Sequence, residues 1–553
     1  MRVLLACMAL AAMQCESIAS IVSVTYTEDH RFEVHSGAVD NWVARANLTS
    51  KYNETGWDFL EVQTSGDFPD TVQAYAAGLA EANVTRHMIV MHWNNTVSGY
   101  CQSQGQEMCD KLNGFIEAND KWVQSMVEQH GETDPYWHQV DLVNHQLKGL
   151  EDGVDLKPTI PGDPGVRWLN LAGDLEDLET ALKDPADRPE NIKADFGGRV
   201  LGAGHCSALI KVLADGEDLY TSQVTWNTYQ SMLRIQKRYV FGYGQTGGAD
   251  KAAIAGRVSS FSSYPGTITS QDDFYVLSSG LVTQETTIGN NNNDLWHFIK
   301  PEGQVLEWVR AAVANNLATD GQEWTSTFSR YNSGTYNNQW MVVDYKRFKR
   351  GDTSLRPGVL WVLEQIPGHI MADDVTHVLQ RQQYWPSYNS PFFPAIFNMS
   401  GNPALVAKFG DWFSYERTPR ALIFRRDQAA VTDVGGMMRL MRYNDFKHDP
   451  LSACDCQPPY SAENGISARC DLNPADGTYP FGALGHRSHG ATDMKLTTTK
   501  LVPGMEFISI AGPTYDQQPP FQWSKADFAA TTPHQGHPDL FKFEPIQWRW
   551  QWK

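Results

Sequence analysis

The spacing of apolar residues predicts helices early in the chain and strands in much of the rest. Between residues 70 and 150, apolar side chains recur at the three-to-four-residue spacing of amphipathic helices, beginning at a capping Asp70. After Cys206 the period changes to two, because segments 207–213 and 219–226 both alternate and the residues between them suit a turn. The sequence therefore predicts a β-hairpin directly behind Cys206.

Further apolar runs predict more strands, at residues 273–281, 340–345, 358–364 and 421–425 and along the aromatic segment 541–552. Residues 151–195 are rich in Pro, Asp and Gly, which predicts an exposed connector where a chain is readily cut. Helices followed by antiparallel strands favour an α+β fold over a doubly wound sheet.

The composition supports a folded core and excludes some partners. The 553 residues are 41% hydrophobic and 20% charged, which excludes a disordered chain. With 45 Lys and Arg against 64 Asp and Glu, the formal net charge is −19. Because this charge repels a phosphate backbone and no basic run offsets it, nucleic acid is not an expected partner.

The first residues have the pattern of a secretory signal peptide. Arg2 precedes an apolar stretch, and small residues near Ala19 suit cleavage, so residues 1–19 are expected to be removed and the protein to be secreted or lysosomal. No later stretch has the length of a transmembrane segment. Five sequons, each of which also arises by chance, are expected to carry glycans: Asn47, Asn53, Asn83, Asn94 and Asn398.

Six cysteines follow the signal peptide. Cys101 and Cys109 flank a Gly-containing loop and are expected to form a local disulfide in an oxidising compartment. Cys454, Cys456 and Cys470 lie in a Pro- and Gly-rich segment. Since cysteines separated by one residue are poorly placed to pair, we expect Cys470 to bond one of the other two, taken as Cys456. Two cysteines are then left over, namely Cys454 in the same segment and one cysteine that lies far in sequence from any other.

That cysteine is Cys206, either a buried small apolar residue or a reactive thiol. Segment 204–208 resembles the G-x-S-x-G elbow, but that motif leads into a helix, whereas a hairpin follows here. The C-G-S-C-W surroundings of papain-like enzymes are absent, and so is an H-E-x-x-H motif. Two His-x-x-His pairs are typical of hydrogen-bonding loop residues, so no metal and no cofactor are expected: His486 with His489, and His534 with His537.

A cysteine at the beginning of a strand, behind glycines and a connector, also fits an N-terminal nucleophile. In that chemistry the thiol attacks the preceding carbonyl, an N-to-S acyl shift follows, and water hydrolyses the thioester. The new α-amino group has a pKa of about 8 and can take the proton of its own thiol. No histidine–aspartate pair is needed beside Cys206.

Several motifs in order resemble the phospholipase B-like family. They are GHCSALIK (204–211), TWNTYQSMLR (225–234), FSSYPGTI (261–268), ETTIG (285–289), RYNDF (442–446), ISAR (466–469) and DLNP (471–474). The resemblance extends from about Ser23 to the C-terminus. It implies a lysosomal or secreted N-terminal nucleophile hydrolase, with an αββα sandwich of antiparallel sheets. By the family's name, it implies removal of acyl chains from phospholipids.

The resemblance also implies the residues of the site. Cys206 is the nucleophile, and His205–Cys206 is the bond cut in processing. Trp226 corresponds to a pocket residue beside the nucleophile, and Thr287 to a residue that hydrogen-bonds near the scissile region. The alternative for Trp226 is an ordinary core residue.

Two further residues complete the implied site. Asn389 offers a side-chain N–H to an oxyanion, a role worth about 3–4 kcal/mol in other enzymes. Arg420 orients Asn389 or the acyl oxygen of the substrate. The alternatives are a turn cap at Asn389 and a surface ion pair at Arg420. The sequence departs from the family at Gln223, where the family typically has a histidine, because glutamine exchanges no proton near neutral pH.

Three functions follow from these patterns. The first is an acyl-ester hydrolase or amidase that acts through Cys206 on a lipid or an N-acyl small molecule. The second is a self-processed, non-catalytic protein of the same fold that binds lipids or glycans. The third is a different secreted hydrolase in which Cys206 is merely buried. In the first two, a fragment of helices and connector (20–205) and a fragment starting with the nucleophile (206–553) form one folded unit.

Overall fold

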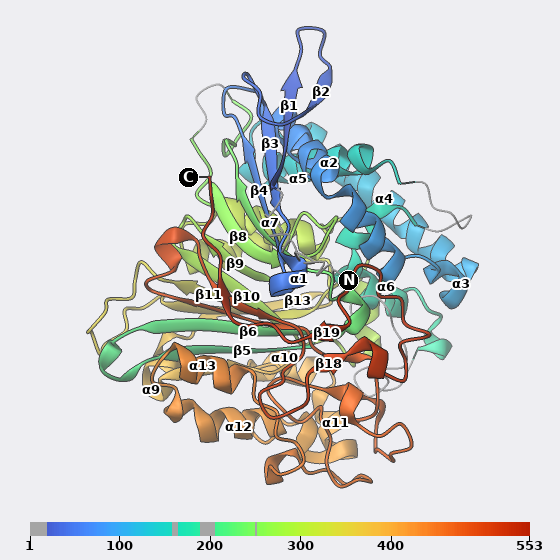
Figure 1. Ribbon diagram of the computed structural model, residues 1–553, viewed down its shortest axis with the longest axis vertical. Coiled ribbons are helices and arrows are strands. Elements are labelled where there is room, and N and C mark those ends of the chain that lie inside the picture. Colours follow the sequence, from blue (N-terminus) through green and yellow to red (C-terminus); the bar gives the residue numbers. More distant parts are fainter. Residues whose placement is uncertain (1–18, 157–163, 189–204, 249–251, 553) are drawn as a thin grey trace, which may run out of the picture.

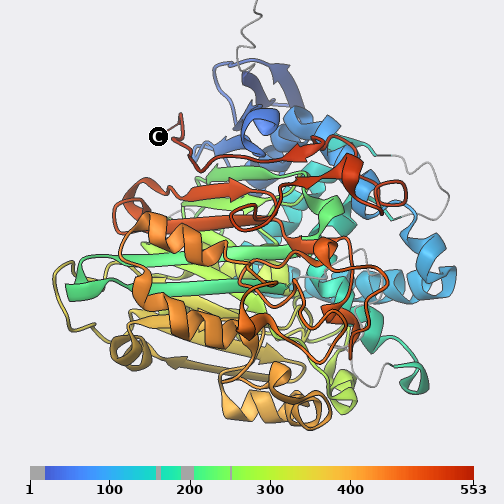
Figure 2. The same cartoon turned by 60° about the horizontal axis from the view of Figure 1, so that its bottom comes forward.

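Two large β-sheets packed face to face form the centre of the protein, with helices on both outer faces (Figures 1 and 2). The computed structural model describes residues 19–156, 164–188, 205–248 and 252–552. Within these residues, paired strands of the two sheets run antiparallel except for one parallel pair, β4 with β7. The protein is therefore a mixed helix-and-strand fold dominated by antiparallel sheets, as the sequence predicts.

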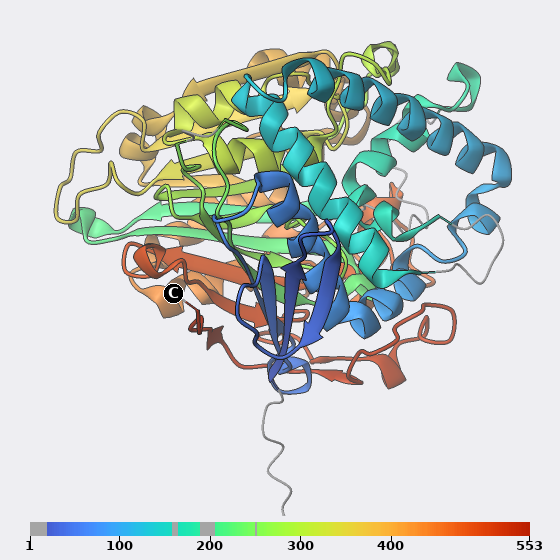
Figure 3. The same cartoon turned by 90° about the horizontal axis from the view of Figure 1, so that it is seen from above.

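The first sheet contains strands from both sides of Cys206. Its spatial order is β13 (His369–Asp374), β12 (Leu360–Ile366), β11 (Asn338–Asp344), β10 (Leu281–Thr287), β9 (Phe274–Leu277), β8 (Val258–Ser263), β7 (Ile235–Val240), β4 (Asp58–Thr64), β3 (Ala44–Thr49), β1 (Ala19–Tyr26) and β2 (Phe32–Ser36). The β4–β7 pair joins the strands that precede Cys206 to those that follow it (Figure 3).

The four N-terminal strands, β1 to β4, correct the sequence analysis, which assigned only helices and a connector to this part of the chain. Most residues of β3 and β4 are buried on both faces of the sheet. Strand β3 alternates between apolar and polar residues (ARANLT), so a short period-two signal is present there and was missed, whereas β4 (DFLEVQT) alternates only in part.

The second sheet carries Cys206. Its order is β14 (Tyr384–Ser387), β5 (His205–Val212), β6 (Leu219–Thr228), β16 (Asp493–Thr498), β17 (Ile508–Ala511) and β20 (Ile546–Gln547), with β15 (His489–Ala491) also paired to β6. Strands β18 (Phe521–Gln522) and β19 (Leu540–Phe541) form a separate pair. The hairpin predicted behind Cys206 is confirmed as β5–β6.

Successive side chains of a strand point to opposite faces of the first sheet, so they contribute to two separate hydrophobic cores. In β11, Met341 and Val343 pack against the second sheet, whereas Trp340 and Val342 pack against the helices on the opposite face. Helices α2, α5, α7 and α8 share the latter core, and α12 and α13 cover the outer face of the β5–β6 hairpin (Figure 2). The layers therefore follow the order helix, sheet, sheet, helix.

The α-helices have the following bounds: α1 (Tyr52–Thr55), α2 (Asp70–Thr96), α3 (Tyr100–Gln104), α4 (Gln106–His130), α5 (Pro135–Val154), α6 (Ala172–Ala181), α7 (Glu307–Leu317), α8 (Gly321–Phe328), α9 (Thr376–Gln382), α10 (Pro394–Met399), α11 (Asn402–Phe409), α12 (Pro419–Asp427) and α13 (Val434–Met441). The predicted helical region 70–150 is confirmed by α2 to α5. Glycines let α2 approach α5 closely, because a Cβ on Gly78 would lie 1.9 Å from the carbonyl oxygen of Gln146. Among the described helices, none has the length and apolar character needed to cross a membrane.

Three predicted segments differ in the structure. Segment 421–425 lies in helix α12, since a short apolar run does not distinguish strand from helix. Part of the predicted connector forms α6, whose Leu175 and Leu178 are fully buried. The aromatic segment 541–552 contains only the end of β19 and the short β20, and its rings instead fill a small core around Trp57.

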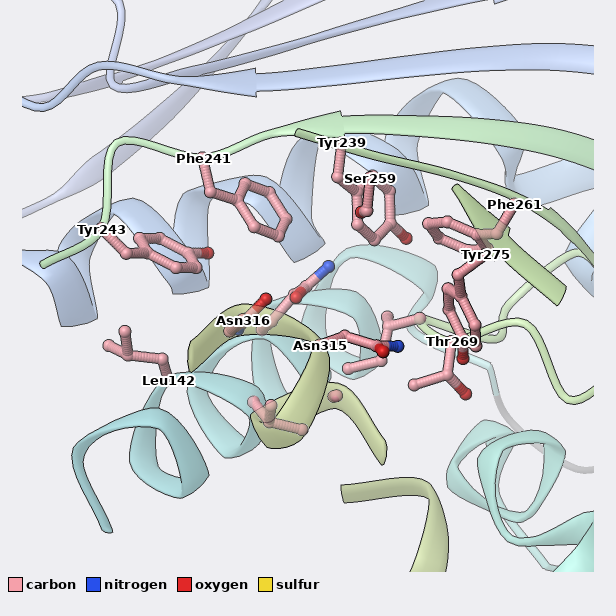
Figure 4. A pocket seen from close by; sticks show the side chains of 14 residues that line it. Leu142, Tyr239, Phe241, Tyr243, Ser259, Phe261, Thr269, Tyr275, Asn315 and Asn316 are labelled. Carbon is pink, nitrogen blue, oxygen red and sulfur yellow. The ribbon is translucent and has the colours of Figure 1, made fainter. Parts of the chain in front are cut away.

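A small cavity lies between the first sheet and helices α5 and α7 (Figure 4). Aromatic side chains from β7 to β9, including Tyr239 and Tyr275, form one wall, and Asn315 and Asn316 project from α7. Its volume of about 40 Å³ holds about three water molecules, too little for an acyl chain. It also lies on the helix-facing side of the first sheet, away from Cys206.

Candidate active site

The β5–β6 hairpin places Cys206 in the second sheet, near the centre of the molecule. Cys206 lies directly opposite Thr225 on β6, and its side chain is 2% exposed. Side chains paired across antiparallel strands project to the same face, so the thiol and the Thr225 hydroxyl lie together. The segment before His205 and most of the predicted signal peptide (residues 1–18) lie outside the described residues.

Arg420, on helix α12, holds the backbone at Cys206. Its guanidinium donates to the carbonyl oxygen of Cys206 at 2.8 Å and to that of Tyr388 at 2.9 Å. The same group lies 4.3 Å from the centre of the Trp226 ring. Burial lowers the pKa of Arg420 to about 10. Its position excludes the surface ion pair considered from sequence and places the side chain beside the predicted nucleophile.

The contact with Tyr388 also brings the neighbouring Asn389 toward Cys206. Asn389 follows β14 in a left-handed backbone conformation (φ 63°), which asparagine tolerates better than most residues. Its side-chain Nδ2 donates to the backbone carbonyl of Thr287 at 2.7 Å. Asn389 and Thr287 are therefore in contact, and the N–H assigned to an oxyanion is engaged by Thr287 in this arrangement. The oxyanion role stays a prediction.

Trp226 is fully buried in the core beneath α12 and α13, and its ring N–H donates to the carbonyl of Ile466 at 3.2 Å. The residue is thus part of the core as well as a neighbour of Arg420. The interpretation as a core residue therefore describes this position, while the role of Trp226 as a pocket residue stays a prediction.

Gln223, at the position where the resemblance leads us to expect histidine, has a structural role in this chain. Its side-chain amide donates to the backbone carbonyls of Asp272, at 2.6 Å, and Glu285, at 2.8 Å. These contacts fasten β6 of the second sheet to the segment between β8 and β9 and to β10 of the first sheet. Gln223 therefore links the two sheets next to Cys206, and its amide exchanges no proton there.

A buried charged network beside Cys206 was missed by the sequence analysis. Lys495, on β16, donates to Asp493 at 2.8 Å and to the hydroxyl of Thr225. Arg234 pairs with Asp272 and, at 3.0 Å, with Asp493. These four charged side chains are at most 2% exposed. They are separated by up to about 260 residues in sequence, and only the pairing of β6 with β16 shows that Lys495 reaches Thr225.

The groups around the Cys206 thiol shift its pKa in opposite directions. Burial, reinforced by the carboxyl of Glu285, raises the pKa of Cys206 well above its usual value, while Lys495 acts to lower it. Burial and the neighbouring carboxyl of Asp273 also raise the pKa of Glu285. In the uncut chain Cys206 is therefore a neutral thiol, and any proton transfer must begin from that state.

Asp273, next to this network, provides a pH-dependent prediction. Burial, with a contribution from Asp272, raises its pKa to about 8, against about 4 in an unfolded chain. Between these values the folded state binds the extra proton, so stability is highest in acid and falls as the pH rises toward 8. We expect the free energy of unfolding to fall by about 1 kcal/mol between pH 7 and pH 8 through this group.

The measurement is urea unfolding at pH 7 and pH 8, for the parent and for Asp273→Asn, which should remove this part of the slope. Asp215→Asn is the control, because Asp215 has the same left-handed conformation but is exposed. The range from pH 7 to pH 8 lies above the pH at which His92 and His537 change the stability, since burial lowers both of their pKa values to about 3. An unchanged slope in Asp273→Asn would contradict the raised pKa.

The cysteine pairing confirms one prediction and corrects another. Cys101 and Cys109 form a disulfide, as predicted. Cys454 pairs with Cys456, so the predicted Cys456–Cys470 bond is wrong. The loop holds the Cα atoms of Cys454 and Cys456 5.3 Å apart, within the usual range for a disulfide, despite the single residue between them. Cys470 is a buried free cysteine.

The predicted glycosylation positions differ in exposure. Asn53, Asn83 and Asn398 are exposed and Asn94 is half-buried. Asn47, on β3, is 1% exposed, and its amide donates to the side chain of Gln551 at 3.1 Å. Asn47 is therefore not an accessible acceptor in the folded chain, while glycans at the other four stay predictions.

The fold and the site define a class: a mixed helix-and-strand protein whose buried cysteine begins a strand of a central antiparallel sheet. The phospholipase B family model matches residues 44–548. The chain is 51% identical over 517 residues to a protein of Mus musculus, which covers 92% of this chain and 85% of that protein. The corresponding Homo sapiens protein is also 51% identical, over 92% of this chain and 86% of its own length. Both relatives are named, provisionally, phospholipase B-like 2.

A Caenorhabditis elegans protein named, also provisionally, phospholipase B-like 1 is 45% identical over 522 residues, covering 92% of this chain and 88% of that protein. The chain belongs to the phospholipase B family, as the motifs around Cys206 indicate. The names describe those relatives.

Proposed function

We propose that this protein hydrolyses acyl ester or amide bonds with Cys206 as its nucleophile, after the chain is cut between His205 and Cys206. The observation that carries the proposal is the position of Cys206, at the beginning of a central strand with its carbonyl oxygen bonded to Arg420 at 2.8 Å. Membership of the phospholipase B family and the four-layer arrangement support an N-terminal nucleophile hydrolase sandwich.

In the processing step the thiol of Cys206 attacks the carbonyl carbon of residue 205, and the acyl group moves from nitrogen to sulfur. This shift frees the α-amino group of Cys206, and water then hydrolyses the thioester, which regenerates the thiol and releases the carboxyl group of residue 205. Lys495 acts to lower the pKa of the Cys206 thiol and Glu285 acts to raise it, so their balance sets how easily the thiol loses its proton for this attack. The predicted signal peptide and exposed sequons support work in a secreted or lysosomal setting.

In turnover, the new amino group takes the thiol proton, and the thiolate attacks the acyl carbonyl of a lipid or an N-acyl substrate. Asn389 donates its side-chain N–H to the developing oxyanion, in place of the carbonyl of Thr287. Arg420 holds both Cys206 and Tyr388, so it fixes the distance between the nucleophile and the corner that carries Asn389. The carbon–oxygen or carbon–nitrogen bond then breaks, and the alcohol or amine leaves with the proton held by the α-amino group. Water hydrolyses the thioester, which releases the acid and restores the thiol.

The second candidate is a cut but non-catalytic protein that binds lipids or glycans. Gln223 favours it, because its amide is held by backbone carbonyls where the resemblance leads us to expect a proton-exchanging histidine. Amino-terminal sequencing and intact mass of the deglycosylated protein test the cut, which both candidates require. Labelling of Cys206 by a thiol-reactive acyl probe, together with release of acid from lipid esters and N-acyl amides, separates the hydrolase from the binding protein.

The oxyanion assignment has its own test in protein already cut before Cys206. Asn389→Ala should leave KM nearly unchanged and lower kcat by about 10²–10³, because the lost hydrogen bond matters mainly in the tetrahedral state. Hydrolysis of a fluorogenic acyl ester measures it. Asn389→Gly is the control for backbone strain, since it keeps the left-handed turn but also lacks the N–H. Parent rates in both variants would make Asn389 a turn residue only.

A further inference from the structure

A second cluster of reactive side chains lies behind Trp226, and the site already described does not use it. Glu463 comes from a loop, Cys470 begins the short helix Cys470–Leu472, and His489 begins strand β15. Their exposed fractions are 3%, 0% and 2%. Each offers one ligand atom, and these atoms lie within 4.8 Å of one another. Three separate segments thus converge on one buried point.

We propose that Glu463, Cys470 and His489 form a binding site for a single zinc-like divalent cation. Thiolate, imidazole and carboxylate are the ligands that zinc takes, and three protein ligands leave a fourth position for water. Zinc–ligand lengths of about 2.0–2.3 Å place tetrahedral ligand atoms about 3.6 Å apart. The Sγ of Cys470 lies 3.8 Å from Nδ1 of His489, close to this separation.

The carboxylate is the ligand that must move. Sγ of Cys470 lies 2.7 Å from Oε2 of Glu463, where the thiol donates its proton. On binding, the S–H bond of Cys470 breaks, its proton leaves to solvent, and a sulfur–metal bond forms. The metal then occupies the place of that proton, and the sulfur–oxygen separation widens by about 0.9 Å to the tetrahedral value. Rotation of the flexible Glu463 side chain provides this change.

Arg487 is the competing cation. Its guanidinium donates to Oε2 of Glu463 at 3.1 Å and lies 3.6 Å from Sγ of Cys470. It also donates to the carbonyl of Ala483 at 3.0 Å, which fixes it at the edge of the cluster. In a metal site Arg487 orients the carboxylate and stabilises the thiolate from outside the ligands, as outer donors commonly do. Without a metal it is itself the positive partner of Glu463.

The position of the cluster indicates a structural role for the ion. The backbone of Ile466, between Glu463 and Cys470, accepts the ring N–H of Trp226, and Ala491, just after His489, pairs with Trp226 across β15 and β6. A metal ion would therefore tie together the segments behind Trp226. The inference does not depend on hydrolysis or on cleavage before Cys206.

The test uses the full secreted chain, stripped with a chelator, and Zn²⁺ or Co²⁺ alone as the probe. We expect one Zn²⁺ per chain by native mass spectrometry and a higher melting temperature on adding Zn²⁺. Co²⁺ should give the near-ultraviolet sulfur-to-cobalt absorption of a thiolate ligand. Cys470→Ser should abolish this band, whereas Cys206→Ala, which removes the other free cysteine among the described residues, should retain it.

Two further variants keep the test decisive. Glu463→Gln keeps the shape of the cluster and should weaken Zn²⁺ binding, and Arg487→Met should weaken it about 10–100-fold as the loss of an outer donor. Absence of stoichiometric Zn²⁺ in the parent chain, or a cobalt band that survives Cys470→Ser, overturns the proposal. Tighter Zn²⁺ binding in Arg487→Met also overturns the assigned role of Arg487, because it would then be the cation that the site already holds.

Discussion

Cys206→Ala should give a single uncut chain, whereas the parent protein should separate into two pieces on a denaturing gel. The C-terminal piece, residues 206–553, should have a mass of about 39 kDa by its share of the 62.0 kDa chain. The expected effect is complete loss of cleavage, since alanine has no nucleophile to attack the preceding carbonyl. Intact mass of the deglycosylated protein measures it directly.

The serine variant is the matched control for this change. Cys206→Ser keeps a nucleophilic atom and should be cut slowly, because a hydroxyl is weaker than a thiolate but makes the same acyl shift. Melting temperatures of both variants should stay close to that of the parent, which shows that the loss is chemical. Cleavage of Cys206→Ala at the same bond would mean that another protease makes the cut.

Lys495→Met should destabilise the protein by about 3–5 kcal/mol. The ammonium of Lys495 lies 2.8 Å from a carboxylate oxygen of Asp493 and 3.7 Å from one of Asp272. Removing one partner leaves buried negative charge without compensation, which is far more costly than losing an exposed ion pair. Because Lys495 also acts to lower the pKa of Cys206, thiol alkylation at neutral pH should become slower. Urea unfolding and alkylation rates check the two effects.

Thr225→Val is the companion variant, because it removes the hydroxyl that Lys495 bonds while leaving every charge in place. Its expected loss of about 1 kcal/mol is that of a single buried hydrogen bond. If Lys495→Met were no more destabilising than Thr225→Val, Arg234 alone would suffice to balance the two aspartates. The network would then not be the support for Cys206 that its geometry suggests.

The hairpin behind Cys206 and the helices between 70 and 150 could be predicted because both have regular hydrophobic periods. Strands β3 and β4 were missed for another reason: β3 alternates over only six residues, and β4 alternates only in part. Segment 421–425, which the sequence assigns to a strand, lies in α12, the helix that carries Arg420 over the β5–β6 hairpin. A short apolar run simply lacks the length to reveal its period.

The site was predictable only where motifs mark it. The motifs around Cys206 and Trp226 identify the hairpin, and family resemblance adds Asn389 and Arg420. Lys495 carries no such mark, because its reach to Thr225 depends on the pairing of β16 with β6. The error at Cys470 has a similar origin, since loop geometry decides which cysteines can meet.

The parallel pair β4–β7 has a consequence for the stability of the protein after cleavage. A cut at Cys206 would leave this sheet continuous while dividing its strands between two polypeptides, β1 to β4 on one and the remainder on the other. Folding of the intact chain is a first-order process. Two separated pieces would have to rejoin in a second-order reaction, which is slow when both pieces are dilute. The mature protein would thus persist because it opens slowly, with a half-life set by its unfolding barrier, and each opening would tend to be final.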